Sequence, residues 1–289
     1  MVTSVETDRT SDVGTSPFEP WPVDAQIHVE WGPSGARLAG DRGDVVVIVD
    51  VLAFSTSVAL TVERGGTALS YSADELDAMG GRDRAAAALA AEIVAKDRAA
   101  TTARFSLSPA SLETIGRGDR LIFTSLNGAA CTAAASNAPH VIVGALTNRS
   151  AVAQILRRLL ADGVAERCTI VACGERWTSV SDEPDSLRPG IEDLLGAGSI
   201  VAALTDLRTS PEAEVAATAF VASEHRILDV LRTCVSGREL IERGFPDDVD
   251  LAAAIDSIAA VPCWRTGNPR REFTALTLPK VPEVPEASR

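Results

Sequence analysis

The run Val45-Val-Val-Ile-Val49, which Asp50 follows, decides the fold class of this chain. A continuous stretch of β-branched residues is typical of a strand that is buried on both faces, and such strands occur in parallel sheets covered by helices. A helix is expected directly after it, capped by Ser55 or Thr56 and ending at Gly65. A buried strand followed by a helix is the repeating unit of an α/β fold.

The same alternation of strand and helix recurs along the chain. Further strands are expected over residues 121–124, 141–145 and 169–172. Helices are expected over 83–96 and 127–136, from Ser150 to Gly163, after Pro189, and from Ser210 to about Arg232. The alternation predicts a three-layer α/β/α fold with a largely parallel or mixed central sheet. Residues 25–276 form the predicted single domain, between a loose N-terminal extension (1–24) and a C-terminal tail (277–289) that both lack hydrophobic periodicity.

Composition narrows the functional class. Of the 289 residues, 46% are hydrophobic but only 4% aromatic, which favours helices layered on a sheet over a β-sandwich. The net charge of -13 argues against nucleic-acid and anionic-membrane partners, so a small anionic ligand would need local compensation by arginines or a divalent cation. No apolar stretch reaches spanning length and the N-terminus lacks the features of a signal peptide, so a cytoplasmic location is expected. The Ala-rich helices imply enough apolar surface for a homodimer.

Several familiar chemistries are excluded by inspection. The sequence contains no G-x-x-x-x-G-K-[ST], G-x-G-x-x-G, H-E-x-x-H or G-x-S-x-G motif. Its five cysteines are odd in number, scattered and mostly set in apolar segments, so buried reduced thiols are expected instead of a zinc site. The three histidines are dispersed, and a structural role is expected for each. What remains is a set of carboxylates, hydroxyls, glycines and arginines, which suits the binding of Mg²⁺ and a phosphate group.

The stretch Phe123-Thr-Ser-Leu-Asn-Gly128 is the most informative polar segment, because it lies where an expected strand turns into a helix. The first N–H groups of a helix lack partners and carry the positive end of its dipole, so phosphate, sulfonate or carboxylate can bind there. Thr124, Ser125 and Asn127 would add polar side chains, and Gly128 would let the backbone come close. Ordinary helix capping is the alternative explanation of the same residues.

Carboxylates at other element ends complete the candidate site. Asp50 ends the first strand, and Glu192-Asp193 lie in the first turn of the helix after Pro189. Because loops at the carboxyl ends of parallel strands converge on one crevice, we expect Asp50, Asn127 and Asp193 to meet there. Mg²⁺ needs only one or two carboxylates, and the candidates are Asp50, Glu192 and Asp193. The alternatives are a turn or helix cap for Asp50 and complementarity to the helix dipole for the acid pair.

Several short segments follow one another in a recognisable order. They are VVIVDVL at 46–52, TSLNG at 124–128, Cys173-Gly174, EDLLGAG at 192–198, SGREL at 236–240 and DDV at 247–249. In this order and spacing the chain resembles the 2-phosphosulfolactate phosphatase (ComB-like) family, over about residues 25–262. The resemblance implies the fold of that family and a Mg²⁺-dependent hydrolysis of 2-phospho-3-sulfolactate to 3-sulfolactate and phosphate.

Carried over to this chain, the resemblance marks Asp50, the loop 124–128, and the Glu192-Asp193 pair with the glycines that follow it at 196 and 198. Asp97-Arg98 is similar to the family's Gly-Glu-Arg element. Ala53 stands where the family usually has an arginine, whereas Arg176 and Arg188 add positive charge near the acid pair.

The predicted site therefore has three groups of residues. The catalytic group is Asp50, Asn127, Arg98, Arg176 and Arg188; the substrate-binding group is Ser55, Thr124, Ser125 and Gly128; the metal ligands are Asp50, Glu192 and Asp193. Together with the resemblance they predict a phosphoric monoester hydrolase that acts on a small phosphorylated acid, with Mg²⁺ as cofactor. The alternative is a catalytically divergent anion-binding or assembly protein on the same scaffold, which the replacement at Ala53 favours.

Overall fold

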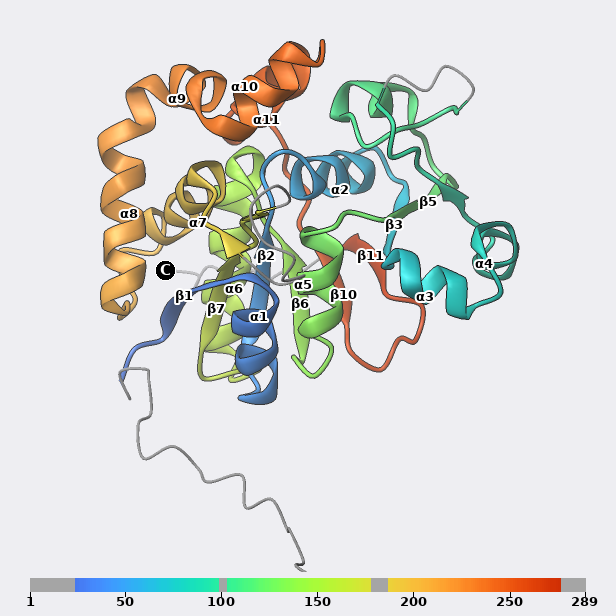
Figure 1. Cartoon of the computed structure of the whole chain (residues 1–289). Coiled ribbons are helices and arrows are strands. Elements are labelled where there is room, and N and C mark those ends of the chain that lie inside the picture. The colour runs from blue at the N-terminus through green and yellow to red at the C-terminus, as the bar shows by residue number, and fades with distance from the viewer. Residues whose placement is uncertain (1–23, 99–102, 178–186, 277–289) are drawn as a thin grey trace, which may run out of the picture.

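A mixed sheet of nine strands runs through the described part of the chain, which comprises residues 24–98, 103–177 and 187–276 of this computed structural model (Figure 1). In spatial order the strands are β1 (Ile27–Trp31), β7 (Cys168–Ala172), β2 (Val45–Val49), β6 (His140–Val143), β10 (Pro262–Arg265), β11 (Glu272–Ala275), β3 (Thr67–Ser70), β5 (Arg120–Phe123) and β4 (Glu92–Ile93). The first four strands are parallel to their neighbours, and so are the last three. The predicted α/β class with a mixed sheet is confirmed. The predicted tail and, apart from Asp24, the predicted extension lie outside the described residues.

The two parallel groups of strands run in opposite senses. Strands β10 and β11 are antiparallel to each other, and they are also antiparallel to β6 and β3, respectively. The sequence analysis expected β2 and β5 to be parallel strands of one sheet, with their carboxyl ends at the same edge. The structure shows instead that they belong to groups of opposite sense. The twist of about 20–25° per strand accumulates to roughly 100° or more between them, and the hydrogen bonds described below show that the loops after β2 and β5 nevertheless meet.

The three layers can be followed through β2, whose side chains alternate between two hydrophobic cores. Val45, Val47 and Val49 pack with residues of α6 (Arg149–Ala161), α7 (Ile191–Ala202) and α8 (Pro211–Ser223). Val46 and Ile48 pack on the other face with residues of α1 (Gly32–Asp41), α2 (Phe54–Glu63) and α5 (Gly128–Ala134) (Figure 1). The remaining α-helices are α3 (Ala73–Ala78), α4 (Arg82–Leu89), α9 (Ile227–Thr233), α10 (Val235–Glu242) and α11 (Pro246–Ala252).

Most expected elements are found near their predicted positions. The strands expected over 121–124, 141–145 and 169–172 correspond to β5, β6 and β7. Ser210 caps α8 as predicted, because its Oγ accepts a hydrogen bond from the N–H of Ala213 at 3.3 Å. The long helix expected to Arg232 is interrupted by a 3₁₀ turn at Glu224–Arg226, after which α9 begins.

Three local predictions were wrong. The helix expected over 83–96 ends at Leu89, since Ala90 has a left-handed φ of 48°, and β-branched Ile93 joins β4 at the sheet edge. Helix α2 starts at Phe54, ahead of the predicted caps Ser55 and Thr56, whose hydroxyls donate to the carbonyls of Ile48 and Val51. Helix α6 starts before Ser150, whose hydroxyl donates to the carboxylate of Asp256 at 2.7 Å.

Two further observations concern membrane-spanning helices and the state of the cysteines. Across the described ranges, no helix is both long enough and apolar enough to cross a membrane. All five cysteines are unpaired, and four of them are buried, which agrees with the expected reduced thiols.

Candidate active site

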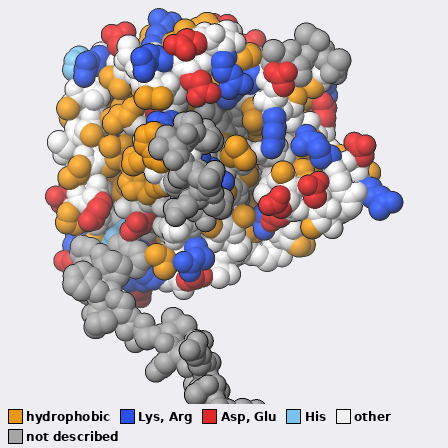
Figure 2. Space-filling model, in the orientation of Figure 1, with side chains coloured by type: hydrophobic (Ala, Val, Ile, Leu, Met, Phe, Trp, Pro, Cys, Tyr) orange, Lys and Arg blue, Asp and Glu red, His pale blue; other side chains and the backbone are white. Residues whose placement is uncertain are grey.

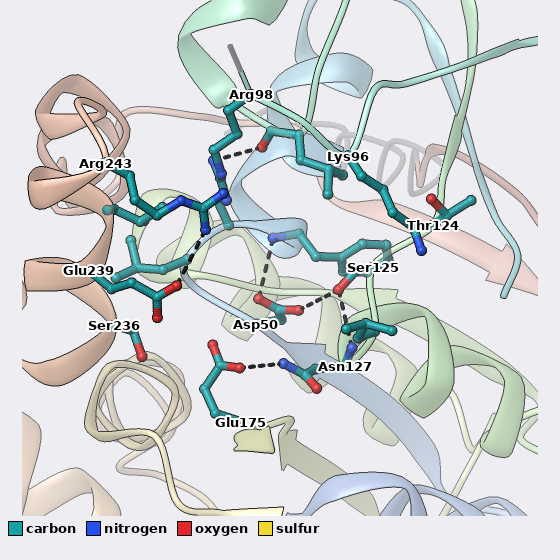
Figure 3. A pocket seen from close by; sticks show the side chains of 16 residues that line it. Asp50, Lys96, Arg98, Thr124, Ser125, Asn127, Glu175, Ser236, Glu239 and Arg243 are labelled. Atoms are coloured by element: carbon teal, nitrogen blue, oxygen red, sulfur yellow. Dashed lines mark hydrogen bonds and ion pairs between the residues drawn. The ribbon is translucent and has the colours of Figure 1, made fainter. Parts of the chain in front are cut away.

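Asp50 is held by the loop that was predicted to bind an anion. The carboxylate follows β2 and is 7% exposed. Its Oδ2 accepts hydrogen bonds from the hydroxyl of Ser125 at 3.1 Å and from the N–H of Gly128 at 3.0 Å, and its Oδ1 accepts from the N–H of Phe54 at 3.3 Å (Figure 3). The anion that this turn receives is therefore the side chain of Asp50 itself, fixed in one orientation.

Gly128 is required for this approach. A Cβ atom at position 128 would lie 2.3 Å from Cδ1 of Phe54 and 2.9 Å from Oδ2 of Asp50, both well inside contact distance. The Phe54 ring is itself fixed, since it packs edge-on against Phe123 with ring centroids 6.3 Å apart. Only glycine leaves room for the backbone, the ring and the carboxylate together.

Two buried side chains fix the strand ends behind Asp50. The hydroxyl of Ser55 accepts from the N–H of Asp50 at 2.9 Å and donates to the carbonyl of Ile48 at 3.0 Å. The carboxylate of Asp193 accepts from the N–H of Val51 through Oδ1 and from the N–H of Gly174 through Oδ2, both at 2.8 Å. Asp193 thus ties the loop after β2 to the loop after β7, and Ser55 is fully buried behind the site.

A cavity of about 280 Å³ opens above Asp50. Its polar lining is Asp50, Lys96, Arg98, Thr124, Ser125, Asn127, Glu175, Ser236, Glu239 and Arg243. In the view of Figure 3, Lys96, Arg98 and Arg243 lie on one side of the space, and Asp50, Asn127 and Glu175 lie on the other. The cavity therefore has an acidic floor and a basic wall.

The acidic floor is electrostatically strained. Burial raises the pKa of Asp50, and the hydrogen bonds from Phe54, Ser125 and Gly128 only partly offset this effect. Burial and the neighbouring charge of Asp50 raise the pKa of Asp193 well above its usual range. The same two causes, burial first, raise the pKa of Glu175 to about 7. Glu192, which is 2% exposed, adds a fourth carboxyl group and accepts a hydrogen bond from the hydroxyl of Ser236 at 2.5 Å. A bound cation would relieve this repulsion.

The predicted arginines are divided between two adjoining cavities. Arg98 lines the first cavity, pairs with Asp248 and donates to the carbonyl of Leu107 at 3.1 Å. Arg176 and Arg188 line a second cavity of about 370 Å³. Asn127, Glu175 and Glu239 line both cavities, so the three predicted arginines lie around one continuous polar region.

The structure brings together most of the predicted site and adds residues that the sequence analysis did not select. Asp50, Ser125, Asn127 and Gly128 meet as expected, and the hydroxyl of Thr124 is buried without a hydrogen-bond partner among the described residues. The added residues are Lys96, Glu175, Ser236, Glu239 and Arg243. Glu175 could have been found, because it follows a glycine at the end of a buried strand; Ser236 and Glu239 lie in the quoted segment SGREL.

The donor chemistry of the floor fits Mg²⁺ bound in its usual open manner. Within the described ranges, no three His, Cys, Asp or Glu side chains converge as a ready-made metal centre, so the predicted trio of Asp50, Glu192 and Asp193 is not a closed cage. Mg²⁺ is typically held by one or two carboxylates together with waters and substrate phosphate. Asp50 and Glu192 fit that requirement, whereas both oxygens of Asp193 already accept backbone N–H groups.

Comparison with known proteins identifies relatives over the same part of the chain. A family model described as 2-phosphosulpholactate phosphatase matches residues 34–267, a range that contains every residue of the site. A protein of Synechococcus sp. (strain RCC307) is 31% identical over 234 residues, which cover 78% of this chain and 90% of that protein. A protein of Deinococcus radiodurans is 29% identical over 232 residues, covering 78% and 89%, and one of Parasynechococcus marenigrum is 28% identical over 231 residues, covering 76% and 88%. Each carries the name "Probable 2-phosphosulfolactate phosphatase".

Proposed function

We propose a substrate and a cofactor for this chain, which belongs to the 2-phosphosulfolactate phosphatase family and is a phosphoric monoester hydrolase. The chain removes phosphate from 2-phospho-3-sulfolactate, giving 3-sulfolactate, and uses Mg²⁺ to do so. The names of the relatives support the substrate. The acidic floor facing a basic wall supports both the cofactor and an anionic ligand.

The basic wall suits a small molecule with several negative charges. The proposed substrate carries a phosphate, a sulfonate and a carboxylate. Lys96, Arg98 and Arg243 reach the cavity from separate parts of the chain and can contact more than one of these groups. Arg98 is paired with Asp248 and Arg243 with Glu239, so part of their charge is already balanced within the protein.

The acidic floor is assigned to the metal and to its positioning. Asp50 and Glu192 would hold Mg²⁺, which supplies charge neutralisation at the phosphoryl oxygens when bound. Ser125 and Gly128 hold Asp50 in its orientation, and Asp193 fixes the loops on either side. Catalysis of phosphoryl transfer depends mainly on such positioning and electrostatic stabilisation.

The alternative predicted from the sequence was a catalytically divergent anion-binding or assembly protein. The comparisons do not favour it, since the relatives that align with most of this chain are named as phosphatases. We therefore propose an active phosphatase and not a non-catalytic binding protein.

The direct test is phosphate release from 2-phospho-3-sulfolactate by the whole chain, with Mg²⁺ and with EDTA. We expect turnover with Mg²⁺ only, and a fall to background in Asp50→Asn, because this change removes the charge of the proposed metal ligand. Asp229→Asn, an exposed carboxylate on α9, is the matched control and is expected to retain full activity. Equal turnover with Mg²⁺ and with EDTA would refute the proposal that Mg²⁺ is the cofactor. If the unmodified chain did not hydrolyse this ester, the proposed substrate would be wrong.

A further inference from the structure

We propose that Glu175 is the general acid of the reaction, donating a proton to the ester oxygen as that oxygen leaves phosphorus. This inference rests on the proposed phosphatase function and adds a catalytic residue that the sequence analysis did not select. It is carried by the place of Glu175 in the cavity and by the way in which one of its oxygens is held.

Glu175 stands at the junction of the two polar cavities. It follows Gly174 after β7, lies in the short strand β8 (Glu175–Arg176), and lines the cavity that contains Asp50. Its Oε2 accepts a hydrogen bond from Nδ2 of Asn127 at 2.8 Å. Its Oε1 has no hydrogen-bond donor within the described ranges, and Figure 3 shows the side chain pointing into the space bordered by Asp50 and Ser236. One oxygen is therefore fixed while the other can carry a proton toward a ligand.

The backbone around Glu175 supports a fixed position. Gly174 has a φ of +65°, a left-handed conformation that glycine adopts readily, and its N–H donates to Asp193. Residues 175 and 176 pair with β9 (Leu187–Arg188) in an antiparallel arrangement. The side chain thus projects from a tethered strand end, which is what a proton donor needs for repeated alignment with a substrate.

Burial is the main reason that the protonated form of Glu175 is favoured. Burial and the carboxylates of Asp50 and Glu192 raise its pKa to about 7, while the hydrogen bond from Asn127 and the charge of Arg188 act in the opposite direction. Asp193 on α7 interacts with it as well, Arg243 lines the first cavity, Arg176 lines the second, and Glu239 lines both. Burial raises the pKa of Asp50 as well, although the three hydrogen bonds that it accepts act in the opposite direction. The two carboxyl groups differ in their hydrogen bonding, since among the described residues both oxygens of Asp50 are held by donors whereas only one oxygen of Glu175 is.

The chemistry of the proposed substrate requires such a donor. The leaving oxygen belongs to a secondary alcohol, and an alkoxide is a poor leaving group. In the step we propose, the P–O ester bond breaks and its electron pair passes to this oxygen, which takes the proton of Glu175. Phosphorus forms its new bond to the oxygen of water, and the proton that water releases returns the carboxylate of Glu175 to its acid form. The products are the alcohol and inorganic phosphate, so atoms and charge balance without another reactant.

The test compares two esters in wild-type protein and Glu175→Gln. Glutamine keeps the size and can accept from Asn127 but cannot donate an acidic proton. General acid catalysis contributes about 10²- to 10⁴-fold, so kcat for 2-phospho-3-sulfolactate is expected to fall by that factor. For 4-nitrophenyl phosphate, whose phenolate leaves without a proton, kcat is expected to change by less than about fivefold. The wild-type rate for the alkyl ester should also fall at high pH as Glu175 loses its proton, and this loss of rate with pH should be absent in the variant.

Controls separate this inference from the function on which it rests. Glu242→Gln on α10, an exposed position, is the matched control and should leave both rates unchanged. Thermal unfolding of Glu175→Gln shows whether the variant is folded, and Glu175→Asp, which keeps the acid, should restore part of the lost rate. If Glu175→Gln lowered kcat equally for both esters, or kept the wild-type fall in rate at high pH, Glu175 would not be the general acid. The phosphatase proposal would be unaffected by either result. A wild-type chain that hydrolyses neither ester would overturn the phosphatase proposal and the general acid together.

Discussion

At the scale of single residues, the segment 124–128 illustrates what a sequence can and cannot specify. Its hydroxyls, amide and glycine indicated a turn that receives an anion, and the structure contains such a turn. The occupant is the carboxylate of Asp50, held by Ser125 and Gly128. A local pattern indicates the chemistry of a turn, but which negative group fills it depends on contacts between residues 75 or more positions apart.

Gly128 provides a prediction at this scale. In Gly128→Ala the new Cβ would collide with the Phe54 ring, and overpacking of this kind costs about 1–3 kcal/mol of unfolding free energy. The shift would also move Asp50, and a displacement near 1 Å can lower kcat/KM about 100-fold. Urea denaturation and phosphatase kinetics measure the two effects. Gly116→Ala, where a Cβ meets no atom within 4 Å, is the control, and equal behaviour of the two variants would contradict the packing argument.

The residues of the basic wall could not be selected from the sequence. Lys96 lies beyond the short strand β4, and Arg243 follows helix α10, so neither stands at the end of a recognisable buried strand. Their approach to Asp50 depends on how distant segments pack. Glu175 is different, because its position after a buried strand and a glycine was visible, but its significance depends on the burial and neighbouring charges that raise its pKa.

At the scale of elements, hydrophobic patterning predicted the long buried strands well and the short ones poorly. The run 45–49 is buried on both faces, as its composition indicates. The segment Pro262–Arg265 mixes apolar and charged residues, as does Glu272–Ala275, and neither has a run that identifies a strand. These two strands reverse the direction of the sheet, so the sequence predicted the layers but not the opposite senses of the two parallel groups.

The glycines of helix α7 show how close packing of elements supports the site. A Cβ at Gly196 would lie 2.6 Å from Cγ2 of Val51, and a Cβ at Gly198 would lie 2.0 Å from the carbonyl oxygen of Ala216. The first glycine lets α7 approach the strand end that carries Asp50, and the second lets α8 approach α7. This packing holds Asp193, in the first turn of α7, against the loops that it bridges.

At the scale of the whole molecule, the homodimer stays a prediction. Exposed apolar side chains occur on successive helices, and they are Ile191 on α7, Val215 and Val221 on α8, Leu228 on α9 and Val235 on α10. Figure 2 shows hydrophobic side chains gathered on the side of the molecule that α7 and α8 occupy. A contact between two copies would bury such a surface.

The buried carboxyl groups predict how stability depends on pH. A carboxyl whose pKa is raised by folding stabilises the folded state below its unfolded pKa, and this contribution is lost as pH rises through the folded value. For Glu175 that window extends from about 4.5 to about 7, and Asp50 and Asp193 act in the same direction. The carboxyls with lowered pKa, Asp119, Asp206 and Asp256, titrate below this window and do not oppose the effect. Burial lowers the pKa of His28 and His140 from 6.5, so these two groups offset part of the fall in stability below about pH 6.5.

Thermal unfolding between pH 5.5 and 8 checks this prediction. We expect Tm to fall across the range, with about 2 kcal/mol lost through Glu175 alone, and we expect a weaker dependence in Glu175→Gln. Mg²⁺ should raise Tm more at pH 8 than at pH 5.5, because metal binding requires deprotonated ligands. A Tm that rises with pH over this range would contradict the electrostatic account of the floor.

The central claim is that Asp50 binds the metal at the meeting point of loops from both parallel groups of strands. A crystal of the whole chain soaked in Mn²⁺ as a Mg²⁺ substitute, with anomalous data, locates the ion. We predict one strong peak at about 2.1 Å from a carboxylate oxygen of Asp50, inside the cavity lined by Lys96, Arg98 and Arg243. Peaks only elsewhere, or an empty cavity at saturating metal, would contradict the account.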